Sequence, residues 1–549
     1  MKLFLLISLV AISLFGRIVT LDEISKYPKS IAKDFYIWQF LEQETTTKEE
    51  AEKAFKQVYR VTPKLRQAYK KRGGIEQLLI PNCPIYSIDD ILQRDDISDE
   101  CVKNNLTPKR ISLLDGDQMA SIIKKYKNRE DRYVSLITMA FYYSQNIEKT
   151  LYANPEIYLD IFLKGDTKIR SDAKFNKELN PLFLQKLIKY KYKFEKFVAN
   201  VIAYGDMYQP IKNSLLKLKP SKQMTTKTLF YLAFELVQSG KEKEALSFFK
   251  FIQKYGYYQV ERDRANFWLY LLTEDSKYLK FLLNSWDINI YTIYAREELG
   301  KPVATNILYE DGFHNYNPIF TPQIDPSNPF DWLKVQKEIA KFQKKKEYQR
   351  LLEFAHFFRN KRHIGIYFYI LERGYKFRKQ SYPTPYREKL KSLSIEDQAL
   401  IYALARQESR FIPSVISKSY ALGMMQIMPF LVKDIAKRRG EKIDLEDMFN
   451  PIKNLDYAIF HIRDLQKQFQ SPLFIAYAYN GGQGFTRRML QSGKFREGKY
   501  EPFLSIETIS YSESRKYGKK VLANYVVYRK LLGKPVSLHQ LLDEVVIKK

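Results

Sequence analysis

A single glutamate, Glu408, stands in surroundings that could tune it for acid–base chemistry. Ile401, Leu404 and Ala405 precede it by seven, four and three positions, and this spacing places them on one helix face with the glutamate. A carboxyl group at the end of an apolar stripe keeps its proton more readily, because poor solvation disfavours the charged form. The spacing therefore predicts a general acid with a raised pKa. The alternatives are a side chain that turns to water or one that pairs with the arginine two positions before or after it.

The element that must position Glu408 is a helix expected from about Ser394 to Glu408 itself. Ser394 is a suitable N-cap, and Glu396 and Asp397 lie in the first turn, where the positive end of the helix favours acidic side chains.

Three segments that follow Glu408 carry polar, aromatic and glycine residues in a recognisable order: Ser417–Pro429, Ala476–Gly482 and Ile506–Tyr517. Together with Gln407-Glu408-Ser409, they resemble the signature motifs of lytic transglycosylases. Those motifs read glutamate-serine, then glycine-leucine-methionine-glutamine-X-methionine-proline, then alanine-tyrosine-asparagine-alanine-glycine. The last reads glutamate-X-isoleucine-proline and, after a gap, glutamate-threonine-arginine-X-tyrosine. Any one of these motifs would be weak evidence for the family, but four in the right order within about a hundred residues form a specific pattern.

The resemblance implies a reaction that uses one carboxyl group where glycoside hydrolysis normally takes two. In this family the glutamate donates its proton to the glycosidic oxygen between N-acetylmuramic acid and N-acetylglucosamine. It then withdraws the proton of the muramyl C6 hydroxyl, whose oxygen attacks C1 and closes a 1,6-anhydro ring without water. Participation by the sugar's own N-acetyl group replaces the second carboxylate. The resemblance assigns the acid–base role to Glu408, and four nearby acids belong to none of the motifs: Asp434, Asp444, Glu446 and Asp447.

Residues of the second motif are expected to bind the substrate. The Ser417 hydroxyl could hold an acetamido or hydroxyl group, and Gln426 offers both a donor and an acceptor to an amide-bearing glycan. Met428 would supply a flexible apolar wall. Core packing is the alternative for all three methionines of this motif, and we prefer it for Met424 and Met425.

The third motif, from Tyr479 through Asn480 to Gly482, is expected to form a loop that lines the cleft. Tyr479 could stack on a sugar ring or donate a hydrogen bond to Glu408; without the other motifs, a simple turn would be the better interpretation. In the fourth motif, Glu507 is expected to bind substrate at the cleft edge, with a surface salt bridge as the alternative. Structural roles are expected for Arg515 and Tyr517.

The chain departs from the family's pattern at five motif positions. Tyr420 stands where glycine is usual, Leu422 where a small residue is common, and Gly481 where alanine is usual. Ser510 replaces proline and Ser514 replaces threonine. None of these is the catalytic glutamate, so they bear on the shape of the cleft and on Glu507.

The formal net charge of +29 favours an acidic partner or surface. Peptidoglycan, with carboxylates on its lactyl groups and stem peptides, is one such partner. Nucleic acid is another, although the export expected from the N-terminal sequence, described next, argues against it. The third interpretation is a lysine-rich surface that serves only solubility. Retention on duplex DNA at physiological salt would favour a nucleic-acid-binding protein, because phosphate contacts are strongly salt-dependent.

The N-terminus is typical of a secretory signal peptide, assigned to residues 1–20. A basic start, Met1-Lys2, precedes an apolar run from Leu3 to Phe15, which is too short to span a bilayer. A buried N-terminal helix is the alternative. Export followed by solubility in the periplasm is expected, with no integral membrane segment after signal removal. Cell-wall synthases or amidases are the protein partners that such a location would suggest.

The chain has two cysteines, Cys83 and Cys101, which could form a disulfide in an oxidising compartment or remain two buried thiols. The bridge would close a loop of 18 residues and contribute about 3 kcal/mol in the chain-entropy model. The five histidines are scattered without metal-ligand spacing, so neither a metal nor another cofactor is expected.

The expected fold is all-α. Residues 21–300 read as successive amphipathic helices, and 226–255 form a clear pair separated at Gly240. Such hairpins stack into a solenoid, because each pair buries its apolar face only against its neighbours. The resemblance implies the same superhelix, which closes into a ring in the large members of the family, although the sequence does not establish closure. A proline-rich connector and a helical linker domain follow at 301–381, then a lysozyme-like catalytic domain at 382–535 and a tail at 536–549.

Two rival functions remain open at this point. A goose-type lysozyme-like hydrolase would release reducing sugar ends, whereas a lytic transglycosylase would release anhydromuramyl ends. A non-catalytic cell-wall-binding scaffold would clear peptidoglycan equally poorly as the wild type and as Glu408→Gln, while both proteins still sediment with it.

Overall fold

The computed structural model describes residues 17–74, 83–106, 110, 114–126, 155–164, 167–171, 173, 175–309 and 322–548. Within these ranges nearly all regular structure is helical, which confirms the all-α prediction. The exceptions among the described residues are the strands β1 (Ile307–Leu308) and β2 (Gln380–Ser381), which pair in parallel with Ile307 opposite Gln380. The predicted signal peptide falls largely on residues 1–16, which lie outside the described ranges.

The chain divides into two compact units, each assembled from segments far apart in the sequence. The first unit comprises Met1–Leu79, Ala304–Ser492 and Lys516–Val545, and the second comprises Ile80–Val303, Gly493–Arg515 and Val546–Lys549. The domain boundaries drawn from the sequence at 300, 381 and 535 stay predictions.

The first unit begins with four short helices and resumes after β1 with the linker helices and the segment that carries Glu408. Its helices are α1 (Leu21–Lys26), α2 (Ile31–Glu42), α3 (Lys48–Phe55), α4 (Pro63–Lys71), α21 (Pro329–Lys345), α22 (Tyr348–His356), η3 (Lys361–His363), α23 (Ile364–Gly374), α24 (Arg387–Leu390), α25 (Ile395–Glu408), α26 (Pro429–Arg439), η4 (Leu445–Phe449), α27 (Pro451–Gln466), α28 (Pro472–Gly481), α29 (Gln483–Gln491), most of α31 (Ser512–Leu531) and α32 (Leu538–Asp543).

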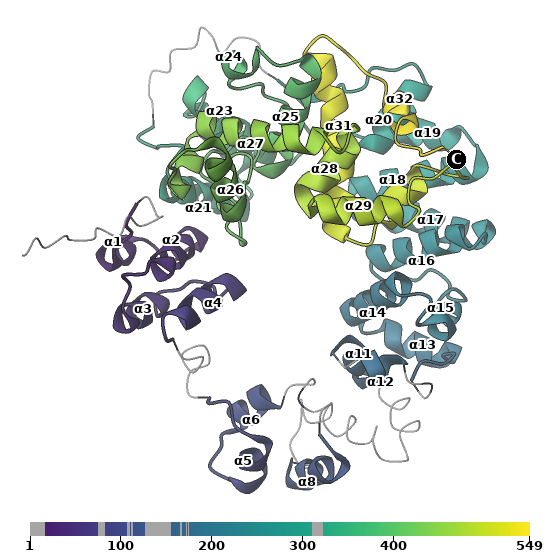
Figure 1. The fold of residues 1–549 in the computed structure, drawn as a ribbon. Helices are drawn as coiled ribbons and strands as arrows, with labels where there is room; N and C mark the ends of the chain where they lie inside the picture. The colour runs from purple at the N-terminus through teal and green to yellow at the C-terminus, as the bar shows by residue number, and fades with distance from the viewer. Residues whose placement is uncertain are drawn as a thin grey trace, which may run out of the picture. The chain divides into compact units, whose positions relative to one another are not determined.

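The second unit is a series of helices that pack mainly on their chain neighbours. These are α5 (Ile88–Gln93), α6 (Asp99–Asn105), α8 (Gly116–Tyr126), α11 (Pro155–Lys164), α12 (Thr167–Ser171), α13 (Pro181–Ile188), α14 (Lys191–Ala203), α15 (Gln209–Leu215), α16 (Thr226–Gln238), α17 (Glu242–Tyr255), α18 (Gln259–Thr273), α19 (Lys277–Leu283), α20 (Ile290–Glu298) and α30 (Phe503–Thr508). Consecutive helices from α16 to α20 contact one another in order, as a solenoid of hairpins requires, and Figure 1 shows α16, α17 and α18 one beside the next.

Local signals in the sequence explain several of these helices. Gly240 adopts φ +71° between α16 and α17, as expected for the residue that ends the first helix of this pair. Thr47 and Glu50 form a capping box at the start of α3. The tail expected after residue 535 contains the short helix α32.

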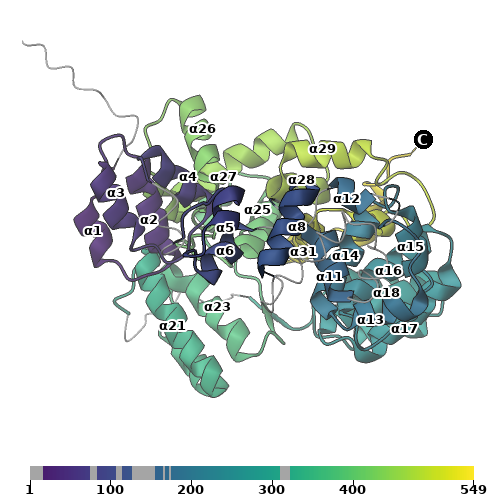
Figure 2. The ribbon, with the colours of Figure 1, turned by 90° about the horizontal axis from the view of Figure 1, so that it is seen from below.

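A hydrophobic core joins α21, α22 and α23, the helices expected for the linker domain. Trp332 and Val335 of α21 pack with Leu351 of α22 and Ile366 and Ile370 of α23, all of them nearly inaccessible to solvent. Figure 2 shows α21 and α23 side by side. This three-helix layer precedes α25 in the chain and supplies a carboxylate that reaches it, described below.

A disulfide joins Cys83 to Cys101 in the second unit, with the two Cα atoms 4.9 Å apart. Within the described ranges, no helix combines the length and the apolar character needed to cross a bilayer.

Candidate active site

Glu408 is the last residue of α25, and the helix forms as the sequence predicts. The Ser394 hydroxyl accepts a hydrogen bond from the Asp397 N–H at 3.1 Å and so caps the first turn. Ile401 and Leu404 of the face shared with Glu408 are buried, at 2% and 0% exposure. Glu408 itself is half-buried, so its carboxyl lies at the boundary between this apolar face and the surface.

Tyr517, from α31, contacts the Glu408 carboxyl directly. Its phenol donates a hydrogen bond to Glu408 Oε1 at 2.6 Å. Burial and the negative charge of Glu408 raise the pKa of Tyr517 well above its ordinary value, so the phenol keeps the proton that it donates. Tyr517, for which a structural role was expected, thus contacts the candidate acid directly.

Tyr479 is the second phenol near Glu408. Burial, followed by the negative charge of Glu408, raises the pKa of Tyr479 well above its ordinary value. Its hydroxyl donates to the Met425 carbonyl oxygen at 2.7 Å, whereas the sequence suggested donation to Glu408. Tyr479 therefore links α28 to the loop of the second motif and stays protonated beside the glutamate.

The predicted loop at Tyr479 and Asn480 is wrong in its secondary structure. Both residues lie in the last turn of α28, which continues to Gly481. The helix is favoured because Pro472 occupies its first position and Ser471 caps it, although the glycine pair predicts a loop. Gly482, with φ +87°, ends the helix, and Asn480 is half-buried.

The loop between α25 and α26 carries the second motif and folds on itself through short antiparallel bridges. Ile416 pairs with Leu422, and Leu422 pairs with Ile427. Gly423 has φ +77°, and a Cβ there would come within 2.1 Å of the Met448 carbonyl oxygen, so no larger residue fits. This loop is thereby held close to η4.

Two buried polar side chains fix this loop against the helices. The Ser409 hydroxyl, next to Glu408, donates to the Met424 carbonyl oxygen at 2.7 Å. Asn454 of α27 accepts from the Met425 N–H at 2.7 Å and donates to the Leu422 carbonyl oxygen at 3.2 Å. Asn454 has no exposed surface and lay outside all the motifs, so its only sequence signal was a polar residue on the apolar face of a helix.

The structure places Ser417, Gln426 and Met428 on this same loop, each partly exposed. The Ser417 oxygen accepts from the Ala421 N–H at 2.9 Å, which closes a turn. The Gln426 amide nitrogen donates to the carbonyl oxygens of Val415 and Gly423, at 3.0 and 2.8 Å. Both polar side chains thus shape the loop, while Met428 precedes the first residue of α26. Met424 and Met425 are buried, at 1% and 0%, as the core-packing interpretation expects.

Tyr420, which stands where the family usually has glycine, has a left-handed backbone with φ +64°. Glycine adopts this conformation without strain, whereas a residue with a Cβ is sterically strained in it. The Tyr420 ring is fully buried against Phe35 and Trp38 of α2, with ring centroids 5.9 and 5.6 Å away. Lys64 of α4 donates to the Ser419 carbonyl oxygen at 2.9 Å. This burial offsets the backbone strain and holds the loop to the N-terminal helices.

Glu507 forms a buried ion pair with Arg264, so the alternative of a surface salt bridge is wrong. It lies in the second unit, where 2% of the residue is exposed. Arg264 of α18 donates to both of its oxygens, at 2.9 Å from Nε and 2.5 Å from Nη2, and the Tyr291 hydroxyl donates to Oε1. A carboxylate with both oxygens occupied inside a helical core indicates a structural role, and the binding of substrate by Glu507 stays a prediction.

The four acids outside the motifs have partners of their own. Asp434 pairs with Arg438, and Asp447 pairs with Lys453. Asp444 accepts a hydrogen bond from the Arg17 N–H, and Glu446 accepts one from Gln39. Across the described ranges, no group of three or more histidine, cysteine, aspartate or glutamate side chains gathers as metal ligands would.

Comparison with known proteins identifies the segment that contains this site. Residues 387–501 match the family model of the transglycosylase SLT domain. The chain is 33% identical over 148 residues to the soluble lytic murein transglycosylase of Salmonella typhimurium, which covers 26% of this chain and 22% of that protein. It is 33% identical over 111 residues to the membrane-bound lytic murein transglycosylase C of Serratia proteamaculans, covering 18% of this chain and 31% of that protein. The chain thus matches about a fifth of the length of its soluble curated relative.

Solved structures of similar proteins extend over more of the chain at lower identity. An inactive mutant of lytic transglycosylase Slt from Pseudomonas aeruginosa aligns with 92% of this chain and 79% of its own, at 14% identity and a TM-score of 0.46. The 70 kDa soluble lytic transglycosylase of Escherichia coli aligns with 94% of this chain and 98% of its own, at 16% identity and a TM-score of 0.35. At these scores the alignments carry no argument about the site.

Proposed function

We propose that this chain is a peptidoglycan lytic transglycosylase with Glu408 as its single acid–base residue. The match of residues 387–501 to the family model of the transglycosylase SLT domain supports this proposal. The observation that carries the proposal is the placement of Glu408. It ends a buried apolar helix face, contacts the protonated Tyr517 and is covalently next to the serine that anchors the second-motif loop. The substrate is the β-1,4 bond between N-acetylmuramic acid and N-acetylglucosamine.

In the first step, Glu408 donates its proton to the glycosidic oxygen, and the bond from C1 to that oxygen breaks. The N-acetylglucosamine side leaves with a hydroxyl group, and the muramyl N-acetyl oxygen shares the positive charge that develops at C1. The Tyr517 hydrogen bond stabilises the Glu408 carboxylate formed here, because donors favour the charged form of an acid.

In the second step, the Glu408 carboxylate accepts the proton of the muramyl C6 hydroxyl, and the C6 oxygen bonds to C1. This closes the 1,6-anhydro ring, returns the proton to Glu408 and consumes no water. The raised pKa expected for Glu408 from its apolar face belongs to this proposal as a requirement of the acid step.

Residues around Glu408 are proposed to hold the glycan. Tyr479 and Asn480 approach from the end of α28, and the partly exposed Ser417, Gln426 and Met428 lie on the second-motif loop. Since Ser417 and Gln426 use part of their hydrogen-bonding capacity to shape the loop, we propose that they present its backbone to the sugar as well as their remaining polar atoms.

The location proposed for the activity is the periplasm, reached through the signal peptide of residues 1–20, with peptidoglycan glycan strands as the anionic partner of this basic chain. Cell-wall synthases or amidases are proposed as protein partners on the same grounds.

The test is mass spectrometry of muropeptides released from purified sacculi by the wild type and by Glu408→Gln. We expect anhydromuramyl ends from the wild type and loss of nearly all turnover, with the fold retained, in the variant. New reducing ends would identify a lysozyme-like hydrolase instead. Equal, poor clearance by both proteins, with both still sedimenting with peptidoglycan, would identify a non-catalytic scaffold.

A further inference from the structure

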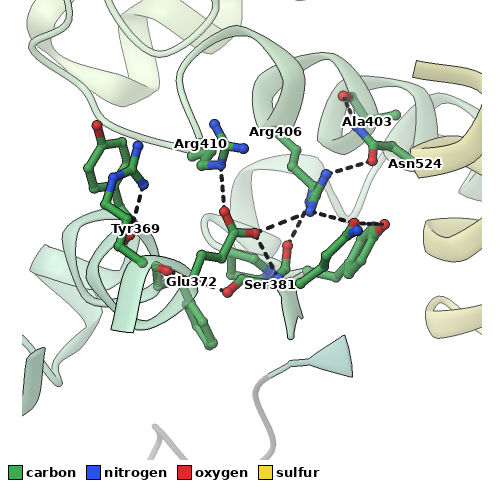
Figure 3. Close-up of polar contacts among 12 residues, drawn as sticks. Tyr369, Glu372, Ser381, Ala403, Arg406, Arg410 and Asn524 are labelled. Atoms are coloured by element: carbon green, nitrogen blue, oxygen red, sulfur yellow. Dashed lines mark hydrogen bonds and ion pairs between the residues drawn. The ribbon is translucent and has the colours of Figure 1, made fainter. Parts of the chain in front are cut away.

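Glu372, near the end of α23, is a buried carboxylate with both oxygens occupied, and 2% of its side chain is exposed. Its Oε1 accepts from the Ser381 N–H at 2.9 Å and from Arg406 Nη2 at 3.2 Å. Its Oε2 accepts from Arg410 Nε at 2.6 Å. Figure 3 shows Glu372 between the two arginines. Burial acts to raise the pKa of Glu372, but the charges of Arg406 and Arg410 outweigh it and the pKa lies below its ordinary value.

The two arginines stand two residues before and two residues after Glu408. Arg406 is in the last turn of α25, and Arg410 lies just beyond the helix, where both it and Phe411 have left-handed backbones with φ +55° and +65°. The chain therefore turns sharply directly after Glu408. A single carboxylate binds the side chains on both sides of this turn.

Arg406 also ties α25 to the helix that supplies Tyr517. Its Nη1 donates to Asn524 Oδ1 of α31 at 2.7 Å, and Asn524 donates in return to the Ala403 carbonyl oxygen of α25 at 3.2 Å (Figure 3). Asn524 and Tyr517 are seven residues apart on α31 and so share a face. The orientation of Arg406 thus affects how α25 is positioned against α31, and therefore how Glu408 is positioned against Tyr517.

A second contact between α23 and this turn is backbone to backbone. A Cβ at Gly365 would lie 2.2 Å from the Phe411 carbonyl oxygen, so α23 packs directly against the residues after Glu408. Gly365 and Glu372 are seven positions apart and lie on the same face of α23. Close packing at one point and an ion pair at the other fix the turn on that face.

We infer that Glu372 is a positioning residue for Glu408: by holding Arg406 and Arg410, it fixes the end of α25 so that the Glu408 carboxyl stays against Tyr517. The inference rests on the proposed function and adds to it a residue outside the matched family segment, 387–501. Its physical basis is that displacing a reacting group by about 1 Å can cost on the order of a hundredfold in rate. A purely structural ion pair would affect unfolding without changing the turnover of folded molecules.

The test compares Glu372→Gln with Glu388→Gln, a control on α24 whose carboxylate is 85% exposed and pairs with Lys391 at the surface. We measure kcat and KM on solubilised glycan strands, per folded molecule, together with hydrogen exchange of residues 405–411. For Glu372→Gln we expect kcat to fall at least tenfold, KM to change less than twofold, and exchange of 405–411 to accelerate. The control should match the wild type in all three quantities.

Arg410→Gln is the second variant, since the Arg410 side chain is 40% exposed and its replacement leaves the pair between Glu372 and Arg406 in place. We expect a smaller loss of kcat in the same direction, with faster exchange of 405–411. Wild-type kcat and exchange in folded Glu372→Gln would overturn the inference, and the same result in Arg410→Gln would overturn it if Glu372→Gln does not fold. If the wild type releases no anhydromuramyl product, the proposed function is rejected instead. The hydrogen-exchange measurement would then still test whether Glu372 fixes the end of α25.

Discussion

The phenol of Tyr517 donates a hydrogen bond to Glu408 Oε1 at 2.6 Å, across a sequence separation of 109 residues. Burial and the charge of Glu408 keep that phenol protonated, so it remains a donor throughout the proposed reaction. The contact joins the first and last motifs of the site, which α25 and α31 carry.

Replacing Tyr517 with phenylalanine removes this donor with little change in shape. A hydrogen bond to a charged group contributes about 1.5–3 kcal/mol, which corresponds to roughly a ten- to hundredfold change in rate. We expect kcat on glycan strands to fall by that amount, because the Glu408 carboxylate loses stabilisation after it donates its proton. Tyr511→Phe, at an exposed tyrosine of the same motif, should retain wild-type kcat. Equal rates in all three proteins would remove Tyr517 from the mechanism.

The sequence predicted the helix of Glu408 and its cap because both are local. Ser394, the apolar face and the helix end at Glu408 all follow from spacing within fifteen residues. The partners of that helix could not be predicted in the same way. Glu372 meets that helix at Arg406, 34 residues away, and Asn454 meets the loop that follows it at Met425, 29 residues away. Each is a polar residue on a buried helix face. The role of such a residue cannot be predicted locally, because its partners are distant in the sequence and adjacent only in the fold.

Motif matching located the residues of the site better than it assigned their roles. Glu507 and Tyr517 belong to the same segment, yet Glu507 is paired with Arg264 while Tyr517 contacts Glu408. Tyr420 shows the opposite situation. Its departure from glycine suggested a change in the cleft, and the structure shows the left-handed backbone retained and the ring used for packing.

Glu507→Gln should destabilise the second unit without weakening substrate binding. Removing one charge of a buried, hydrogen-bonded pair leaves Arg264 uncompensated, which typically costs about 3–5 kcal/mol. We expect a lower urea midpoint for the variant and an unchanged KM. Glu242→Gln, which breaks the exposed pair with Lys499 in the same unit, should leave the midpoint nearly unchanged. A raised KM with wild-type stability would restore the substrate-binding role of Glu507.

Tyr420→Gly should loosen the second-motif loop even though glycine suits its backbone. Loss of a buried aromatic ring costs about 3–5 kcal/mol, and relief of the left-handed strain returns about 1–2 kcal/mol. We expect a net loss of about 1–4 kcal/mol in the free energy of unfolding of the first unit, with faster hydrogen exchange in 415–427. Tyr59→Gly, at a tyrosine that is 61% exposed near the same helices, provides the comparison. A glycine variant as stable as the wild type would show that the ring contributes no net packing.

Asp263 of α18 makes the stability of the second unit depend on pH. It has no exposed surface, and its carboxylate accepts from Gln259, Ser285 and Asn289 at 2.8, 2.7 and 3.0 Å. Burial raises its pKa from 3.8 to about 6, because these hydrogen bonds offset only part of the lost hydration. The protonated form is therefore favoured in the folded protein relative to the unfolded chain.

The sign of the effect follows from this raised pKa. The stabilisation linked to protonated Asp263 is complete below the unfolded pKa of 3.8 and is lost as the pH rises through about 6. Between pH 4 and 7.5 the wild type should lose about 2 kcal/mol that Asp263→Asn does not lose, since asparagine has no proton to release. Urea unfolding of both proteins at the two pH values measures this difference, and Asp206→Asn, at an exposed position, should follow the wild type. Parallel pH dependence in wild type and Asp263→Asn would show that this carboxyl titrates near its ordinary value.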